Sequence, residues 1–220
     1  GMLSSVKYPT GGYSYFEYEL HDADKFVSRS AAINNGLPVL SNYGIVPGNK
    51  VGGVRIKRIT HSDVNIPAYP SGINPDRCNV TEFEYLQGGN STNTSSGILY
   101  RFPVYHTSFT LNNKSVERVT PYNQAFCPND RSHIGYSRVI EKRSDNSSIV
   151  YNFSTCEDIP DDNMMGISAG YNPNQNQFFR EVVSHSAVRG KLKSINAFDS
   201  DGREVAEEIF SYYTDSLPSY

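Results

Sequence analysis

The chain has 220 residues, enough to bury a core as one domain or two small ones. Its 20 basic and 23 acidic residues give a formal net charge of −3 and are spread along the sequence, which argues against nucleic acid as a partner. Apolar stretches are only a few residues long, so neither a signal peptide nor membrane insertion is expected. The 16 tyrosines and 11 phenylalanines favour half-buried strands, and we predict an all-β fold.

The sequence begins with a predicted hairpin over residues 3–20. Its turn, Pro9-Thr10-Gly11-Gly12, supplies a fixed φ at proline and residues that accept positive φ. The strand after the turn, 13–18, carries aromatic side chains on both faces. A strand of this kind is not expected to face water on either side, so another part of the chain should pack over it.

Residues 21–50 are rich in Asn, Gly and Pro and are predicted to be a long loop with at most one helical turn, near 24–32. Residues 51–60 alternate in the manner of a strand, with the cationic side chains expected to point outward. A Pro, Gly and Asn stretch then leads into a second strand, 78–86. We expect this strand to pair antiparallel with residues 53–60.

Two more hairpins are predicted in the middle of the chain, after a polar loop at 88–97. Their turns are Asn112-Asn113-Lys114 and Ser144-Asp145-Asn146-Ser147, which contain residues that tolerate a left-handed backbone. The expected strands are 98–111, 115–120, 134–143 and 148–154.

The C-terminal part begins with an acidic and then Asn/Pro/Gly-rich loop, 157–177. Residues 178–213 are predicted to return to strands around a turn at Asp201-Gly202. Residues 203–213 could instead form an amphipathic helix through Val205, Ile209 and Tyr212, and we favour the strand.

The opening phrase 6–18 and the closing phrase 195–205 share one pattern: a strand with aromatic residues, a glycine turn and a second strand. A repeated hairpin is typical of an extended β surface. We therefore expect antiparallel hairpins, a meander that forms a curved sheet or an incomplete barrel with long irregular loops. Residues 1–220 should form a single β-rich module, a fragment of a larger protein, with 1–120 and 121–220 as an alternative division.

Seven short phrases follow one another along the chain. They are Tyr8-Pro9-Thr10-Gly11-Gly12-Tyr13, Phe16-Glu17-Tyr18-Glu19, Gly52-Gly53-Val54-Arg55-Ile56-Lys57-Arg58-Ile59, Gly97-Ile98-Leu99-Tyr100, Ile134-Gly135-Tyr136-Ser137, Glu141-Lys142-Arg143-Ser144-Asp145 and Arg189-Gly190-Lys191-Leu192. Near the end of the chain, Phe198-Asp199 is followed by Asp201-Gly202-Arg203 as a turn and return. In this order the phrases resemble a segment of large secreted proteins of Bacteroidetes that carry Rhs-like tyrosine-aspartate (YD) repeats, and Phe198-Asp199 stands where such repeats often have Tyr-Asp.

The resemblance implies an extracellular or outer-membrane surface location and a noncatalytic structural role, because activity in that family usually resides in a separate terminal domain. Its implied partners are the flanking segments of the same polypeptide. Unpaired strand edges also suggest self-association. An adhesion module that binds a glycan or a protein is the alternative, since tyrosine rings can stack on sugars. Against a glycan site, Trp is absent and alternate aromatics on strands more often pack against each other.

Catalytic residues and cofactors are not expected, and a hydrolase is not favoured. Histidine neighbours a carboxylate or a hydroxyl at His21-Asp22, His61-Ser62-Asp63 and Ser184-His185-Ser186, but a triad is defined by geometry in space. There is no Gly-x-Ser-x-Gly elbow, and the five histidines lack the short spacing of a zinc site.

The only candidate metal ligands are the carboxylates of Glu157, Asp158, Asp161 and Asp162, which could bind calcium or form a solvated acidic loop. Asp199-Ser200-Asp201-Gly202 begins like a calcium loop, but Phe210 stands where the closing glutamate belongs, so a hairpin turn is expected. The three cysteines, Cys78, Cys127 and Cys156, have no metal-ligand spacing, and their odd number leaves at least one without a disulfide. We expect them to be buried thiols.

Overall fold

The computed structural model describes residues 1–28, 39–41, 50–74, 76–88, 94–100, 106–111, 114–119, 133–159, 162–163, 182–183, 185 and 188–212. All of the elements named below are strands, which confirms the all-β prediction. The strands are β1 (Ser5–Lys7), β2 (Tyr13–Asp22), β3 (Lys25–Ser28), β4 (Val39–Ser41), β5 (Lys50–Ser62), β6 (Cys78–Glu84), β7 (Gly97–Leu99), β8 (His106–Leu111), β9 (Lys114–Val119), β10 (Ile134–Tyr136), β11 (Arg138–Arg143), β12 (Ser148–Phe153), β13 (Asp162–Asn163), β14 (Val182–Val183), β15 (Leu192–Phe198) and β16 (Glu204–Ile209).

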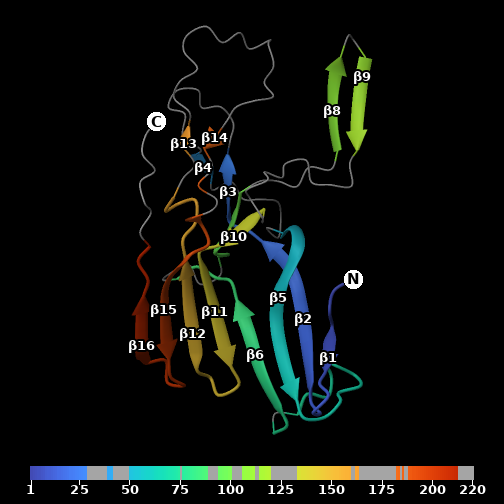
Figure 1. The fold of residues 1–220 in the computed structure, drawn as a ribbon, viewed down its shortest axis with the longest axis vertical. Helices are drawn as coiled ribbons and strands as arrows, with labels where there is room; N and C mark the ends of the chain where they lie inside the picture. Colours follow the sequence, from blue (N-terminus) through green and yellow to red (C-terminus); the bar gives the residue numbers. More distant parts are fainter. Residues whose placement is uncertain are drawn as a thin grey trace.

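The main sheet has eight strands in the order β1-β2-β5-β6-β11-β12-β15-β16, and all of its pairs are antiparallel (Figure 1). It is an open sheet with β1 at one edge and β16 at the other, so it does not close into a barrel. The predicted partnership of 53–60 with 78–86 is confirmed by the pairs from Arg58–Glu82 to Ser62–Cys78.

The two hairpins with the repeated sequence pattern lie at opposite edges of this sheet, as β1/β2 and β15/β16. In the second hairpin Gly202 has φ of 79°, which favours glycine, and its amide donates to the Asp199 carbonyl at 3.0 Å. The Asp199 carboxylate accepts the amides of Asp201 and Arg203 at 3.0 and 2.8 Å. Residues 204–209 are therefore a strand, as favoured over the helix.

A smaller sheet of four strands, in the order β10-β7-β3-β4, corrects two expectations. Residues 25–28 form β3, not a helical turn, and β2 extends to Asp22 where a loop was predicted. The pair β3/β7 is parallel, which departs from a purely antiparallel fold. The reason is tertiary packing: Phe26 and buried Ala23 join a cluster with Val51 of β5, which outweighs the local turn signals.

Each of two segments that were predicted as one strand is divided into two strands that belong to different sheets. Residues 97–99 pair in the small sheet whereas β8 pairs with β9 as a separate hairpin. Likewise, β10 belongs to the small sheet and β11 to the main sheet, and the chain crosses between them at Ser137, whose amide donates to the Ser96 carbonyl at 3.1 Å. The main sheet and the small sheet therefore each contain strands from before and from after residue 120.

The predicted cover over the aromatic N-terminal strand is present on one face of β2. Ile66 and Tyr69, from the segment between β5 and β6, pack on Tyr15, and the rings of Tyr15 and Tyr69 stack at 4.7 Å. Tyr13 stacks next to Tyr15 at 6.2 Å. Tyr15 is only 6% exposed, so this row of rings is a core and not an exposed platform for sugars.

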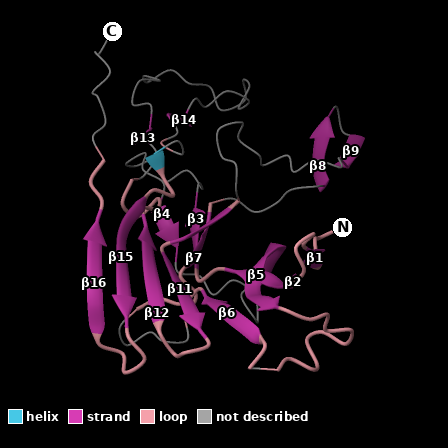
Figure 2. Ribbon diagram, turned by 60° about the horizontal axis from the view of Figure 1, so that its bottom comes forward, coloured by secondary structure: helices cyan, strands magenta, loops and turns pink. Residues whose placement is uncertain are grey.

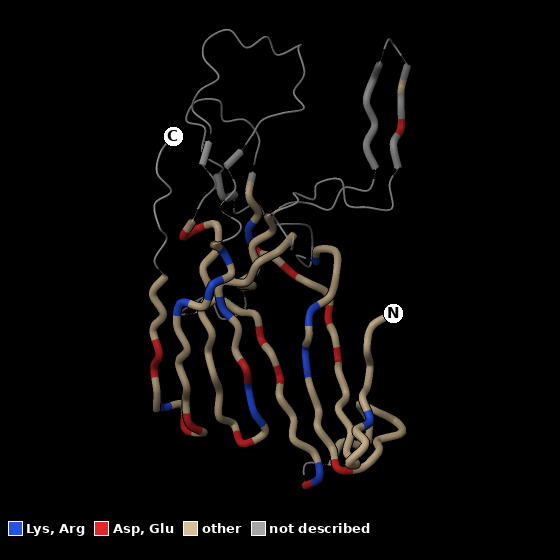
Figure 3. Tube along the Cα trace, in the orientation of Figure 1, with Lys and Arg blue, Asp and Glu red and all other residues tan. Residues whose placement is uncertain are grey.

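Charged side chains form a row across the middle of the main sheet, on the same face as the tyrosine core. Directly paired residues in the row are Glu17, Arg58, Glu82 and Lys142, on β2, β5, β6 and β11, so the charges alternate in sign (Figure 3). Arg58 contacts Glu17 at 3.1 Å and Glu82 at 2.6 Å. Exposed pairs of this kind contribute little free energy individually, but they favour this register over a shifted one.

The other half of the main sheet buries few apolar side chains within the described part of the chain. Figure 2 shows β11, β12, β15 and β16 side by side, and the only buried apolar side chain among these strands is Val150. All six residues of β16 are exposed, including Val205 at 64% and Ile209 at 73%. No helix among the described residues is long and apolar enough to span a membrane.

Candidate functional site

The densest convergence of polar side chains lies where the small sheet packs on β2 and β5, and Arg55 is its centre. The side chain of Arg55 is 8% exposed, which corrects the prediction that the cations of this strand point outward. Its guanidinium donates to Glu19 Oε1 at 2.6 Å and to both carboxylate oxygens of Asp22 at 2.6 and 2.9 Å. Burial of a guanidinium requires such partners, and β2 supplies both.

Two tyrosine rings enclose the same guanidinium. Its carbon lies 4.2 Å from the ring centroid of Tyr85 and 5.1 Å from that of Tyr136, within the range of a cation–π contact. Arg55 also donates to the Tyr136 hydroxyl at 2.9 Å. Because Tyr136 belongs to β10, these contacts hold the small sheet against the main sheet.

Four ionisable groups of this cluster each keep one protonation state at neutral pH. Burial opposes the charge of Arg55, but hydrogen bonds to Asp22 and the contact with Tyr136 outweigh it and raise the pKa of Arg55. Burial would raise the pKa of Asp22, yet hydrogen bonds from Arg55 and Ser95 lower it. Burial raises the pKa of Tyr85 to about 12 and also raises the pKa of Tyr136. None of these four groups is poised to exchange a proton near pH 7, so the arrangement acts as a structural clamp.

Two histidines complete the cluster. His21 Nδ1 lies 2.9 Å from the Tyr136 hydroxyl, and His133 Nε2 lies 2.6 Å from the Gly52 carbonyl oxygen. The two rings meet edge to face with centroids 5.7 Å apart. Gly53 makes room for them, since a Cβ there would lie 3.0 Å from His21 Cδ2 and 3.3 Å from His133 Cε1. Sequence reasoning missed this pair because the histidines come from distant segments.

The clamp should weaken as the pH falls, because of His21. Burial first, and then His133 and Arg55, lower the pKa of His21, with Asp22 and Glu19 opposing. An unfolded histidine takes up its proton near pH 6.5, so the unfolded chain binds more protons than the folded chain just below that pH. The free energy of unfolding should therefore decrease from about pH 6.5 down to the lowered folded pKa and then level off.

Urea unfolding of the wild type and His21→Gln between about pH 7.5 and pH 5 measures this effect. The variant should show a shallower decrease, since its side chain at position 21 does not titrate. Equal slopes for the two proteins would contradict the assignment to His21.

Of the sequence neighbours considered for hydrolysis, the two groups that the structure describes in full do not form a triad. His61 Nδ1 lies 2.7 Å from the hydroxyl of Ser14, but Ser14 is fully buried, and Asp63 pairs with Arg77 at 2.8 Å. His21 and Asp22 turn to different partners, Tyr136 and Arg55. Ser184 and Ser186 lie outside the described residues.

Two of the candidate calcium ligands are engaged in ion pairs. Glu157 contacts Lys25 at 2.5 Å, and Asp158 contacts Lys193 at 2.6 Å and accepts the Thr155 amide at 2.9 Å. Asp161 lies outside the described residues, as does the side chain of Asp162. Across the described ranges, no three His, Cys, Asp or Glu side chains are grouped so as to hold a metal ion.

Neither of the two described cysteines belongs to a group of side chains that could hold a metal ion. Cys78 and Cys156 are buried, as expected, and Cys127 lies outside the described residues.

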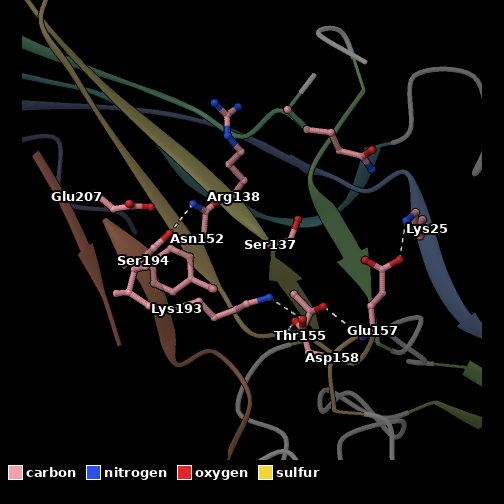
Figure 4. A pocket seen from close by; sticks show the side chains of 14 residues that line it. Lys25, Ser137, Arg138, Asn152, Thr155, Glu157, Asp158, Lys193, Ser194 and Glu207 are labelled. Atoms are coloured by element: carbon pink, nitrogen blue, oxygen red, sulfur yellow. Dashed lines mark hydrogen bonds and ion pairs between the residues drawn. The ribbon is translucent and has the colours of Figure 1, made fainter. Parts of the chain in front are cut away.

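A cavity of about 620 Å³ lies against the ends of β11, β12, β15 and β16 that are nearest the small sheet (Figure 4). Its walls are mostly polar and contain three cationic and three acidic side chains. The cations are Lys25, Arg138 and Lys193, and the acids are Glu157, Asp158 and Glu207. Sequence reasoning did not predict this grouping, because its members come from five separate segments.

Comparison with known proteins adds no relative to this description: the chain matches no protein-family model, no curated protein and no solved structure at a significant level.

Proposed function

We propose that this chain is a noncatalytic structural module of a secreted or cell-surface protein, in which neighbouring polypeptide extends its open sheet. The observation that supports this most is β16, an edge strand with six exposed residues and, among the described strands, the single neighbour β15. An edge strand presents unpaired amides and carbonyls that readily pair with another strand.

The hydrogen bonds of β16 indicate which amides are available. The Phe210 amide donates inward, to the Lys193 carbonyl at 2.9 Å. In an antiparallel ladder the direction alternates from residue to residue, so the amides of Glu207 and Ile209 are directed away from β15. Next to them, the apolar side chains of Val205 and Ile209 are exposed on the same strand.

The resemblance to Rhs-like repeat proteins supports the same role and the surface location that we propose with it. In such proteins successive hairpins build a wall, and here the two hairpins with the repeated pattern stand at the outer edges of one sheet. A further hairpin on either side would continue that sheet. The saturated bonding of the Arg55 clamp also favours a structural over a catalytic use of the most polar cluster.

Self-association of the isolated chain is the test, with a second copy in place of the neighbouring segment. The wild type should form dimers or larger species as its concentration rises, and Val205→Lys/Ile209→Lys should reduce this because edge lysines disfavour strand pairing. Sedimentation equilibrium from about 5 to 500 μM covers the range of weak association.

Leu20→Lys/Val54→Lys is the matched control. These residues pair directly on the strands β2 and β5 and are 52% and 38% exposed, so the control makes the same chemical change away from β16. It should associate like the wild type. A wild type that stays monomeric throughout, or a control that loses association equally, would count against the proposal.

The adhesion alternative gains no support from the stacked tyrosines, because the central ring, Tyr15, is buried and Tyr13 and Tyr69 are half-buried against the same core. A different feature favours a binding function, namely the polar cavity beside β11 and β12.

A further inference from the structure

Arg138 differs from the other arginines of the main sheet in forming no ion pair with any carboxylate that the structure describes. Arg55, Arg58 and Arg143 each contact a carboxylate within 3.2 Å. The Arg138 guanidinium makes one hydrogen bond within the described part of the chain, from Nη1 to the Leu86 carbonyl at 3.2 Å. Burial accordingly lowers the pKa of Arg138, with only partial compensation from Glu84, whereas the pKa of Arg55 and that of Arg58 are raised.

The other cations at this cavity are already neutralised. Figure 4 shows the Lys25–Glu157 and Lys193–Asp158 ion pairs as dashed lines, and no dashed line reaches Arg138. A guanidinium has five N–H donors in a planar fork, and four of those of Arg138 have no protein acceptor among the described residues. This cavity therefore contains an unsatisfied, partly desolvated cation suited to a planar anion.

Side chains that can hydrogen-bond to the hydroxyl groups of a ligand lie directly across the strands from Arg138. Asn152 and Ser194 are its successive cross-strand neighbours on β12 and β15. The Asn152 side-chain amide donates to the Ser194 hydroxyl at 2.9 Å, and this hydroxyl donates to Asn196 Oδ1 at 3.2 Å. Within the described part of the chain, the Asn152 side-chain oxygen and one lone pair of the Ser194 oxygen remain as acceptors. Glu207 on β16 accepts from Asn196 at 3.2 Å and retains further acceptor capacity towards the cavity.

We infer that this cavity binds a sugar acid, with the carboxylate of the sugar on Arg138 and its hydroxyls on Asn152, Ser194 and Glu207. A monoanion fits the charges better than a phosphate dianion, because the two lysines are paired and Glu207 adds a negative charge on the far side. The row of amide, hydroxyl and carboxylate groups is what a polyhydroxylated ligand needs for orientation. This binding site goes beyond the structural role and does not depend on it.

Titration of the isotope-labelled chain with glucuronate and galacturonate, followed by the NMR signals of the Arg138 Nε–H and the Asn152 side-chain amide, tests the inference. We expect saturable shifts with a dissociation constant on the order of 1 mM, as suits a ligand of this size. Glucose, acetate and glucose 6-phosphate separate the contributions of the carboxylate, the hydroxyls and a second negative charge. Equal shifts from acetate and glucuronate, stronger shifts from the phosphate, or no shifts at all would overturn the assignment.

Variants on the same strands locate the site. Arg138→Gln should weaken binding about tenfold or more, because a charge-assisted hydrogen-bond pair is lost. Arg143→Gln, the same change on the same strand outside the cavity, should bind like the wild type. Asn152→Asp keeps the shape of the side chain and places a carboxylate opposite Arg138, so it should raise the melting temperature and block the sugar acid. Unchanged binding in both Arg138→Gln and Asn152→Asp would refute the site even if one variant were poorly folded.

Discussion

Replacing Arg55 with alanine is expected to lower the free energy of unfolding by about 3 kcal/mol, the largest effect of any single side chain in the clamp. The substitution leaves Asp22 and Glu19 without their principal partner while both remain mostly shielded from water. It also empties the space between the rings of Tyr85 and Tyr136. Loss of the charge partner and loss of packing act in the same direction.

Arg58→Ala is the matched control, because Arg58 also joins two carboxylates but its side chain is 23% exposed against 8% for Arg55. It should cost no more than about 1 kcal/mol. Urea unfolding monitored by tyrosine fluorescence gives both values. Equal losses in the two variants would mean that the Arg55 cluster is no more than another surface ion pair.

Gly97→Ala should be nearly as damaging, at about 3 kcal/mol, because the site has no room for a methyl group. A Cβ on Gly97 would overlap the backbone carbonyl oxygen of Asp22 and lie 3.0 Å from the ring of Tyr136 and 3.1 Å from the Ser95 hydroxyl. The backbone cannot easily withdraw, since the Gly97 carbonyl accepts the Asp24 amide at 3.1 Å and its amide donates to Ser95 at 3.0 Å. The expected result is separation of the small sheet from the main sheet.

The two-dimensional NMR spectrum of Gly97→Ala would then lose dispersion for β3, β7 and β10 before the strands β11 to β16 are affected. Gly88→Ala is the control, because its new methyl would meet only the flexible Arg138 side chain, at 3.7 Å. A Gly97→Ala protein with wild-type stability would show that β7 does not sit tightly on the end of β2.

The hairpins of the main sheet could be predicted because their information is local. In β11/β12 and β15/β16 the turn residues and the alternation of side chains lie within a few positions of each other. Asn146, in the first of these turns, adopts φ of 64°, a conformation that asparagine tolerates. The preference for a strand instead of a helix at residues 203–213 rested on the same kind of local evidence.

The small sheet could not be predicted because its strands are three or four residues long and its pairs join distant segments. Nothing near Lys25–Ser28 indicates that it will lie parallel to Gly97–Leu99. The burial of Arg55 was missed for the same reason: alternation assigns a side chain to a face but does not reveal that β10 will cover that face. The cavity around Arg138 likewise depends on which strands become neighbours.

Amide hydrogen exchange of the wild type tests whether β16 is an open edge at which another strand continues the sheet. At low concentration the amides of Glu207 and Ile209 should exchange quickly, whereas those of Glu208 and Phe210, directed towards β15, should be protected. At high concentration the first pair should become protected as strands of two copies join. Exchange of Glu207 and Ile209 that stays fast at every concentration would contradict the claim.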